Sequence, residues 1–271
     1  MGLATGLGNQ VPAEAGAVLI VGPTEKFMPE EVDTLLAYVR KGGKLFVMVD
    51  PDKDVGLTPL LAGLGVELLP GTVVSETQHM KRSHNQSDRG IIFSNRYTSH
   101  PSVTTVTRHQ REVATVFVNG GALKASTAQG EPKPKVTFPL RTSAEFWRDL
   151  NGDFARNGDE KTETVNLMAA VTLKAGDDEG RAVIISDGDF MTNKIAPNSG
   201  NMLLFVDSLA WLIGNEDLSG EVSSEEDIAI EHSSEKDKLW FYATTFAVPA
   251  PIALLGVWVA RSRRRRAEAK S

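Results

Sequence analysis

The sequence has no cysteine among its 271 residues. This absence excludes disulfides, thiolate nucleophiles and cysteine-ligated metal sites, and it is compatible with an oxidising compartment. Three enzyme signatures are missing as well: a G-x-x-x-x-G-K-[ST] phosphate loop, a G-x-S-x-G nucleophile elbow and an H-E-x-x-H zinc motif. The sequence therefore predicts a protein that is not an enzyme and does not itself hydrolyse ATP.

Basic clusters are missing from most of the chain. The net charge is −6, but the last eleven residues hold six basic side chains against one glutamate, so this tail carries +5 and the rest carries −11. Nucleic-acid binding depends on lysine and arginine clustered over a folded surface. The acidic body therefore argues against a nucleic-acid partner. Hydrophobic residues make up 41% of the chain, which is enough for a full core.

One long uncharged segment is present near the C-terminus. Residues 239–260 contain no charged side chain, have Trp240 near one end and Trp258 near the other, and precede the arginine-rich tail 261–271. As a helix this segment rises about 33 Å, which matches one hydrocarbon core. The positive-inside rule places the tail in the cytoplasm and the body outside. These features predict a single-pass protein of the inner membrane with a periplasmic body.

Residues 1–16 (MGLATGLGNQVPAEAG) predict an irregular start. They contain neither the basic region nor the apolar run of an export signal. Two explanations are open: the sequence begins inside a longer protein whose first membrane helix precedes it, or the chain is tail-anchored with its body in the cytoplasm. We favour the first explanation because of the family resemblance given below.

Residues 17–214 show the pattern of an α/β domain. Apolar runs at 17–22 and 44–50 predict buried strands. The segment 29–41 between them predicts a helix, with Pro29 in its first turn and Gly42 as its stop. Strand, helix and strand in this order form a βαβ unit, which predicts a parallel sheet.

The rest of the domain is less regular. Residues 75–112 are polar and lack periodicity, so they predict an inserted long loop, and 129–135 predict an exposed turn. The acidic, serine-rich residues 215–238 predict a linker between the domain and the membrane span. The remaining predicted elements are a helix at 59–64, extended segments at 66–74, 113–118 and 165–173, a strand at 181–187 and a helix at 202–213.

Polar side chains follow two of the predicted strands. Asp50 ends the strand at 44–50, and Asp187, Asp189 and Asn193 lie at the end of the strand at 181–187 or just beyond it. Ligands of open parallel sheets sit outside the carboxyl ends of the strands, so these residues are candidates for binding a cation or sugar hydroxyls. Aspartate and asparagine at such turns also cap the local main chain. Both interpretations stay open.

Four histidines are candidate metal ligands: His79, His84, His100 and His109. Their spacings match no helical or knuckle pattern of zinc ligands. We therefore expect histidines in solvent-facing loops, no metal site and no cofactor.

Several motifs together resemble a known family. They are VLIVGP at 18–23, GGKLFVMVDP at 42–51, SHPSVT at 99–104, LRTSAEFW at 140–147, and a final run at 181–217 with D-G-D-F-x-x-N and W-L-x-G-x-E-D. In this order they resemble the auxiliary component of gliding-motility-type ABC transport systems, the GldG-like proteins.

The resemblance implies a flavodoxin-like, glutamine-amidotransferase-like parallel-sheet domain anchored beside an ABC permease and a separate ATPase. Carbohydrate or a protein is the implied ligand. Amidotransferases of that fold use a cysteine nucleophile, which this chain lacks. Family members begin with a membrane helix and a further βα unit, so the resemblance also implies an N-terminal truncation that leaves an apolar sheet edge exposed.

Two functional hypotheses are open. The first is a non-enzymatic, membrane-anchored subunit of an ABC transport system whose extracytoplasmic domain binds a substrate or partner. The alternative is a metal- or carboxylate-dependent hydrolase that acts on surface polysaccharide through Asp187 and Asp189.

Overall fold

The computed structural model describes residues 11–12, 14–127, 132–175 and 178–215, together with the single residues Thr245 and Trp258. The chain divides into two compact units, Met1–Ser224 and Glu225–Ser271. Apart from Asn215 and those two single residues, the predicted linker, membrane span and basic tail lie outside the described residues. Within the described part, no helix combines the length and the apolar character needed to cross a bilayer.

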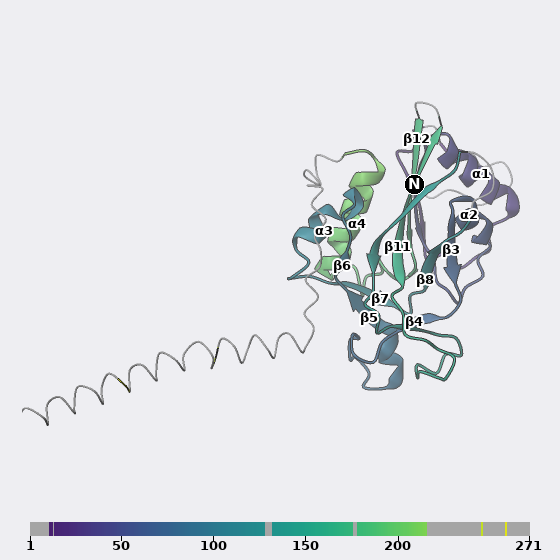
Figure 1. The fold of residues 1–271 in the computed structure, drawn as a ribbon. Coiled ribbons are helices and arrows are strands. Elements are labelled where there is room, and N and C mark those ends of the chain that lie inside the picture. The colour runs from purple at the N-terminus through teal and green to yellow at the C-terminus, as the bar shows by residue number, and fades with distance from the viewer. Residues whose placement is uncertain are drawn as a thin grey trace, which may run out of the picture. The chain divides into compact units, whose positions relative to one another are not determined.

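An eight-stranded mixed sheet lies at the centre of the first unit (Figure 1). Its parallel part consists of β1 (Val18–Val21), β2 (Lys44–Met48) and β12 (Asp178–Ile185). Its antiparallel part adds β11 (Asn166–Ala175), β8 (Ala122–Ala125), β3 (Val66–Leu69), β9 (Lys135–Arg141) and β6 (Arg96–Tyr97).

The expectation of a parallel sheet is therefore correct for β1, β2 and β12 and wrong for the other five strands. β11 and β12 are consecutive in the chain and form a hairpin from Ala175↔Asp178 to Met168↔Ile185. Hairpin strands run antiparallel, whereas a parallel pair needs a long crossover. The direction of the sheet changes at this hairpin.

Helices cover both faces of the sheet (Figure 1). The helices α1 (Pro29–Arg40) and α2 (Thr58–Gly63) pack on one face, and α3 (Thr104–Arg108) and α4 (Ser199–Leu212) pack on the other. Alternate residues of β2 point in opposite directions: Leu45 and Val47 join the core under α1, and Phe46 and Met48 join the core under α4. Burial on both faces explains why this strand is an unbroken apolar run.

The helix predicted at 29–41 is confirmed. Pro29 opens it, and the Glu31 carboxylate accepts a hydrogen bond of 2.8 Å from the Met28 main-chain N–H. Gly42 follows its end with φ +97°, a conformation that favours glycine. This helix was predictable because its start, apolar face and stop are all encoded locally.

The prediction of a long loop at 75–112 is wrong. This region contains fully buried Ile92, Val103 and Val106 in the core under α4. The elements there, besides β6 and α3, are η1 (Gln86–Gly90), β5 (Ile91–Ser94) and η2 (Pro101–Val103). Each is too short to show a periodic pattern, so sequence periodicity missed them.

Two further sheets have two strands each. β5 pairs with β7 (Thr115–Val118), and β4 (Thr72–Val74) pairs with β10 (Trp147–Asp149). The extended segment predicted at 66–74 is thus split between two sheets, at Gly71 with φ +91°. Of the exposed turn predicted at 129–135, residues 129–131 lie outside the described residues, and Lys135 belongs to β9 instead.

β1 is an edge strand of the central sheet. Among the described strands it pairs with β2, and two of its apolar side chains, Leu19 and Val21, are 43% and 51% exposed. Val18 and Ile20 are buried on the other face. An edge strand with exposed apolar side chains is a surface on which another strand can pair.

Candidate functional site

The carboxyl ends of β1, β2 and β12 meet at one edge of the sheet. The main-chain ladder continues past the strands, since Gly22 N donates to Met48 O at 3.2 Å and Val49 N donates to Ile185 O at 3.1 Å. This register brings Asp50 and Asp187 to neighbouring strand ends, as the sequence predicted. Such an edge is where ligand sites occur in open α/β sheets.

Asp50 links the two strand ends. Its Oδ1 accepts a hydrogen bond of 2.7 Å from the Gly188 main-chain N–H, and its Oδ2 forms an ion pair of 2.7 Å with Lys53 Nζ. The hydrogen bond to Asp50 raises the pKa of Lys53 against partial desolvation, and the charges of Asp50, Asp52 and Asp189 add to this. Lys53, three residues beyond Asp50, belongs to this site and was missed by the sequence analysis.

Asp187 lies deeper and has no exposed surface. Its Oδ2 accepts a hydrogen bond of 2.6 Å from Val118 N, and its Oδ1 accepts one of 2.7 Å from Asp189 N. Burial raises the pKa of Asp187 to about 7; the two main-chain hydrogen bonds oppose this rise, and the charges of Asp50 and Asp189 increase it. The carboxyl group therefore titrates near neutral pH without contact with solvent.

Two glycines make this close packing feasible. A Cβ at Gly188 would lie 2.5 Å from Asp50 Oδ2. A Cβ at Gly22, whose φ is +48°, would lie 2.7 Å from Gly188 O. Contacts this short are not found for real Cβ atoms, so main chain and carboxylate fill the space that a ligand would need between the strand ends.

The four predicted residues divide into two groups. Asp50 and Asp187 are buried and spend their oxygens on main-chain donors and Lys53, which is the capping role left open by the sequence. Asp189 and Asn193 are exposed on the turn that follows, and Asp189 contacts Asp187 through its main-chain N–H. The four side chains therefore do not line a common binding site.

A hollow of about 400 Å³ lies at the carboxyl end of β1. Residues 23–28 and Glu31 line it. Phe27 N donates to Val55 O at 3.0 Å, and Lys26 pairs with Asp54 at 2.5 Å, so the hollow's wall is tied to the loop after Asp50. Its lining mixes charged Glu25, Lys26 and Glu31 with apolar Phe27 and Met28, and no motif in the sequence marked it.

The histidines are dispersed. His84 and His109 are exposed, as expected, whereas His100 is half-buried against Trp211, with ring centroids 5.0 Å apart. Burial lowers the pKa of His100 to about 4, and the charges of Lys135 and Arg181 lower it further. The expectation of solvent-facing histidines is thus wrong for His100 and for His79, which is half-buried. Across the described ranges, no three histidine or acidic side chains form a metal-holding group by themselves.

The Trp211 ring also contacts a cation. The Arg181 guanidinium of β12 lies 5.2 Å from its centroid, and Arg181 Nη1 donates to the Trp211 carbonyl oxygen. This contact fastens the last turn of α4 to the central sheet. Cation–π contacts of this kind contribute about 0.5–2 kcal/mol.

Comparison with known proteins gives a family and a fold. A solved structure titled "mmIFT52 N-terminal domain" is similar with a TM-score of 0.54 and 15% identity, over 72% of this chain and 76% of that chain. At this identity the likeness concerns the fold alone, a mixed α/β domain. Comparison with curated proteins finds no match. The model of the family described as ABC-type uncharacterized transport system matches residues 6–208, which include nearly all of the described domain. The chain therefore belongs to this family, as an auxiliary component of an ABC-type transport system.

Proposed function

We propose that this chain is a non-catalytic, membrane-anchored subunit of a gliding-motility-type ABC transport system, whose α/β domain lies outside the cytoplasm and binds a substrate or a partner protein. The family match over residues 6–208 carries the proposal. The uncharged segment 239–260 and the basic tail after it support the anchor and its orientation. The partners are a permease and a separate ATPase, because the sequence has no phosphate loop of its own.

The burial of Asp187 argues against a catalytic role for this residue. A carboxyl group with a pKa near 7 is suited to general acid–base chemistry. A general acid must, however, reach the substrate within hydrogen-bond distance, and Asp187 is fully buried with both oxygens occupied by main-chain donors. The hydrolase hypothesis through Asp187 and Asp189 therefore has no geometric support.

The lack of cysteine allows a direct test of topology. A single cysteine would be introduced either in the domain, as Ser99→Cys on an exposed loop, or in the basic tail, as Ser271→Cys. We expect a membrane-impermeant maleimide to label Ser99→Cys in intact spheroplasts and Ser271→Cys only after the membrane is permeabilised. Labelling in the reverse order would contradict the proposed orientation, and the cysteine-free parent chain is the background control.

A second experiment tests the partnership. Affinity purification of the full chain from mild detergent should recover a polytopic permease and a nucleotide-binding ATPase in constant ratio. Recovery of neither protein, with the tagged chain itself intact in the membrane fraction, would contradict the proposed function.

A further inference from the structure

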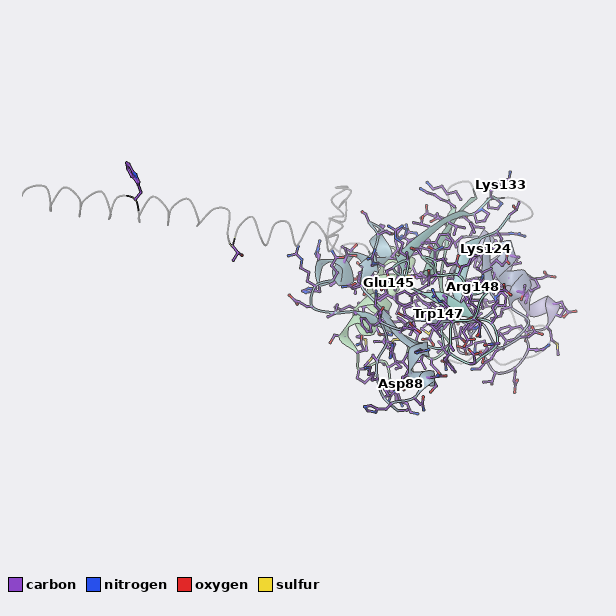
Figure 2. All side chains as sticks on the ribbon, turned by 60° about the horizontal axis from the view of Figure 1, so that its bottom comes forward. Asp88, Lys124, Lys133, Glu145, Trp147 and Arg148 are labelled. Atoms are coloured by element: carbon purple, nitrogen blue, oxygen red, sulfur yellow. The ribbon has the colours of Figure 1, made fainter. Side chains whose placement is uncertain are left out.

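The segment after β10 carries an ordered set of oxygen donors. Figure 2 marks the strand by Trp147 and Arg148. Residues 149–160 (DLNGDFARNGDE) follow, and this segment is named the 149–160 loop below. In twelve-residue calcium loops the side chains at the first, third, fifth, ninth and twelfth positions and the carbonyl at the seventh supply the ligands.

The donor types match these positions one by one. Asp149, Asn151, Asp153, Asn157 and Glu160 occupy the five side-chain positions, and Ala155 occupies the seventh. The acid at the twelfth position is a glutamate, which in such loops binds through both oxygens. The order and type of the donors are properties of the sequence, independent of how the loop is folded, and they distinguish it from a mere group of acidic residues.

The main chain wraps around the first donor. Asp149 is 2% exposed. Its carboxylate accepts hydrogen bonds from Gly152 N at 2.8 Å and Phe154 N at 2.7 Å, with a longer one from Asn151 N at 3.2 Å. The loop therefore curls over Asp149, and the following donors are carried toward one another.

Three of those donors meet at one atom. Asn151 Nδ2 and Asn157 Nδ2 lie 3.1 and 2.9 Å from Asp153 Oδ2. A cation at this place would be met by amide oxygens in place of amide nitrogens, which requires a 180° rotation of each amide group. For Asn151 this rotation gives up the hydrogen bond of 3.1 Å that Asp153 N donates to its Oδ1.

Glu160 closes the loop. Its Oε1 accepts a hydrogen bond of 3.0 Å from Leu150 N, and its Oε2 accepts one of 2.8 Å from Asn157 N. Glu160, at the twelfth position, therefore lies beside Leu150 at the second and Asn157 at the ninth. Beside it opens a hollow of about 400 Å³, lined by residues 156–158 and 160–162.

The loop departs from the motif at the sixth position, where glycine normally makes the sharp turn. Phe154 stands there, with φ +56°, the left-handed conformation that glycine would supply. Two contacts hold this conformation: Arg89 Nη1 donates to Phe154 O at 2.8 Å, and the Phe154 ring lies against Gly90. The backbone shape of the turn is therefore kept although the glycine is absent.

We propose that the 149–160 loop binds Ca²⁺. The three carboxylates do not close on one point alone, so the two asparagine amides, the Ala155 carbonyl and water complete the six to eight oxygens that Ca²⁺ takes. Mg²⁺ demands a smaller, near-octahedral shell and binds more weakly to such a loop. A single, largely exposed loop predicts a dissociation constant of about 10⁻⁴–10⁻³ M, as in extracellular modules.

The test uses the purified full chain and two matched variants. Tb³⁺ bound in the loop would be sensitised by Trp147, two residues before Asp149, and Ca²⁺ added to the complex should displace it. Asp153→Asn removes a donor charge, and Asp159→Asn removes the same charge from an exposed, non-donor position of the same loop. We expect Asp153→Asn to weaken Ca²⁺ binding in calorimetry at least tenfold and Asp159→Asn less than twofold.

Equal weakening in the two variants would show diffuse attraction to an acidic surface and would overturn the proposal. So would the absence of saturable Ca²⁺ binding to the wild-type chain up to about 10 mM, ten times the weakest expected dissociation constant. Glu160→Gln provides a second donor variant, and an unchanged thermal transition in chelator confirms that each variant is folded. The result is independent of the proposed transport function, which the topology and purification experiments test separately.

Discussion

Aspartate side chains have different surroundings at the strand ends and in the 149–160 loop. Asp187 has no exposed surface, and both of its oxygens accept main-chain hydrogen bonds. Asp153 is exposed, and one of its oxygens is shared by two side-chain amides. If a buried carboxylate turned to a ligand, the main-chain N–H groups that it accepts from would lose their acceptor, at a large cost in free energy. Exposed side-chain amides can instead form hydrogen bonds with water. The contrast holds between Asp187 and Asp153, whereas Asp149 and Glu160 of the loop also accept main-chain hydrogen bonds, as Asp187 does.

The largest expected effect is that of Asp187→Ala. It leaves the buried N–H groups of Val118 and Asp189 without an acceptor, so we expect a loss of about 2–5 kcal/mol of unfolding free energy. Urea denaturation of the full chain measures it. Asp189→Ala is the matched control, because its side chain is exposed and its main-chain N–H is retained; it should change stability by less than about 0.5 kcal/mol. Similar losses in both variants would remove the distinction between the two carboxylates.

An added methyl group should destabilise the protein at the strand ends and leave its stability unchanged in the 149–160 loop. Gly188→Ala places a Cβ 2.5 Å from Asp50 Oδ2, and we expect overpacking to cost about 1–3 kcal/mol. Gly158→Ala in the 149–160 loop adds a methyl group in open space and should be neutral within about 0.5 kcal/mol. Thermal melting of both variants tests this, and a stable Gly188→Ala would show that the strand ends are not closely packed.

The raised pKa of Asp187 predicts a specific pH dependence. Its value is about 7 in the folded state against 3.8 for the model group, so between these values the unfolded chain loses a proton that the folded chain keeps. Its contribution to stability is therefore fully present below about pH 4 and falls as pH rises to 7, by at most about 1.4 kcal/mol per pH unit. Asp187→Asn abolishes this slope.

The measurement is the difference in unfolding free energy between wild type and Asp187→Asn at several pH values from 4 to 7.5. Groups with lowered pKa, such as Asp54 and Asp88, contribute to both proteins and cancel in the difference. The advantage of wild type should shrink as pH rises. A difference independent of pH would mean that Asp187 is ionised throughout this range.

The smallest expected change in stability is that of Asp153→Asn. In the presence of a chelator, Asp153→Asn should alter stability by less than about 0.5 kcal/mol, because the side chain is exposed and asparagine can still accept from Ala155 N. Differential scanning calorimetry of the full chain measures this. A loss as large as that of Asp187→Ala would assign the loop carboxylates a structural role like that of the strand ends.

The parts of the fold that were predictable are those with local signals. The helix after Pro29 and its flanking strands were found from a proline, an apolar face and a glycine within one stretch. The strands β8 and β10 were not predicted, because they have only four and three residues. Their partners are distant in sequence: β8 pairs with β3 at separations of 53–59 residues, and β10 pairs with β4 at separations of 73–77 residues. The direction of the strands was predicted wrongly at β11 and β12, which form an antiparallel hairpin and not a parallel pair joined by a crossover.

For the candidate site, the sequence predicted where the residues lie but did not determine what they do. The meeting of Asp50 and Asp187 followed from the parallel order of β2 and β12. Their role did not, because it depends on the main-chain N–H of Val118, 69 residues from Asp187, and on the close approach of Gly188. The donor order of the 149–160 loop was present in the sequence but lay beside, not inside, the motifs of the family resemblance.

The contact of Arg181 with Trp211 has a mechanical consequence. α4 is the last long element described before the chain continues beyond Asn215, so tension on the following segment enters the domain through the final turn of this helix. Arg181 transfers that tension to β12. Because β12 pairs with β11 from Asp178 to Ile185 and with β2 from Arg181 to Ile185, this one contact ties the end of α4 to two ladders of main-chain hydrogen bonds.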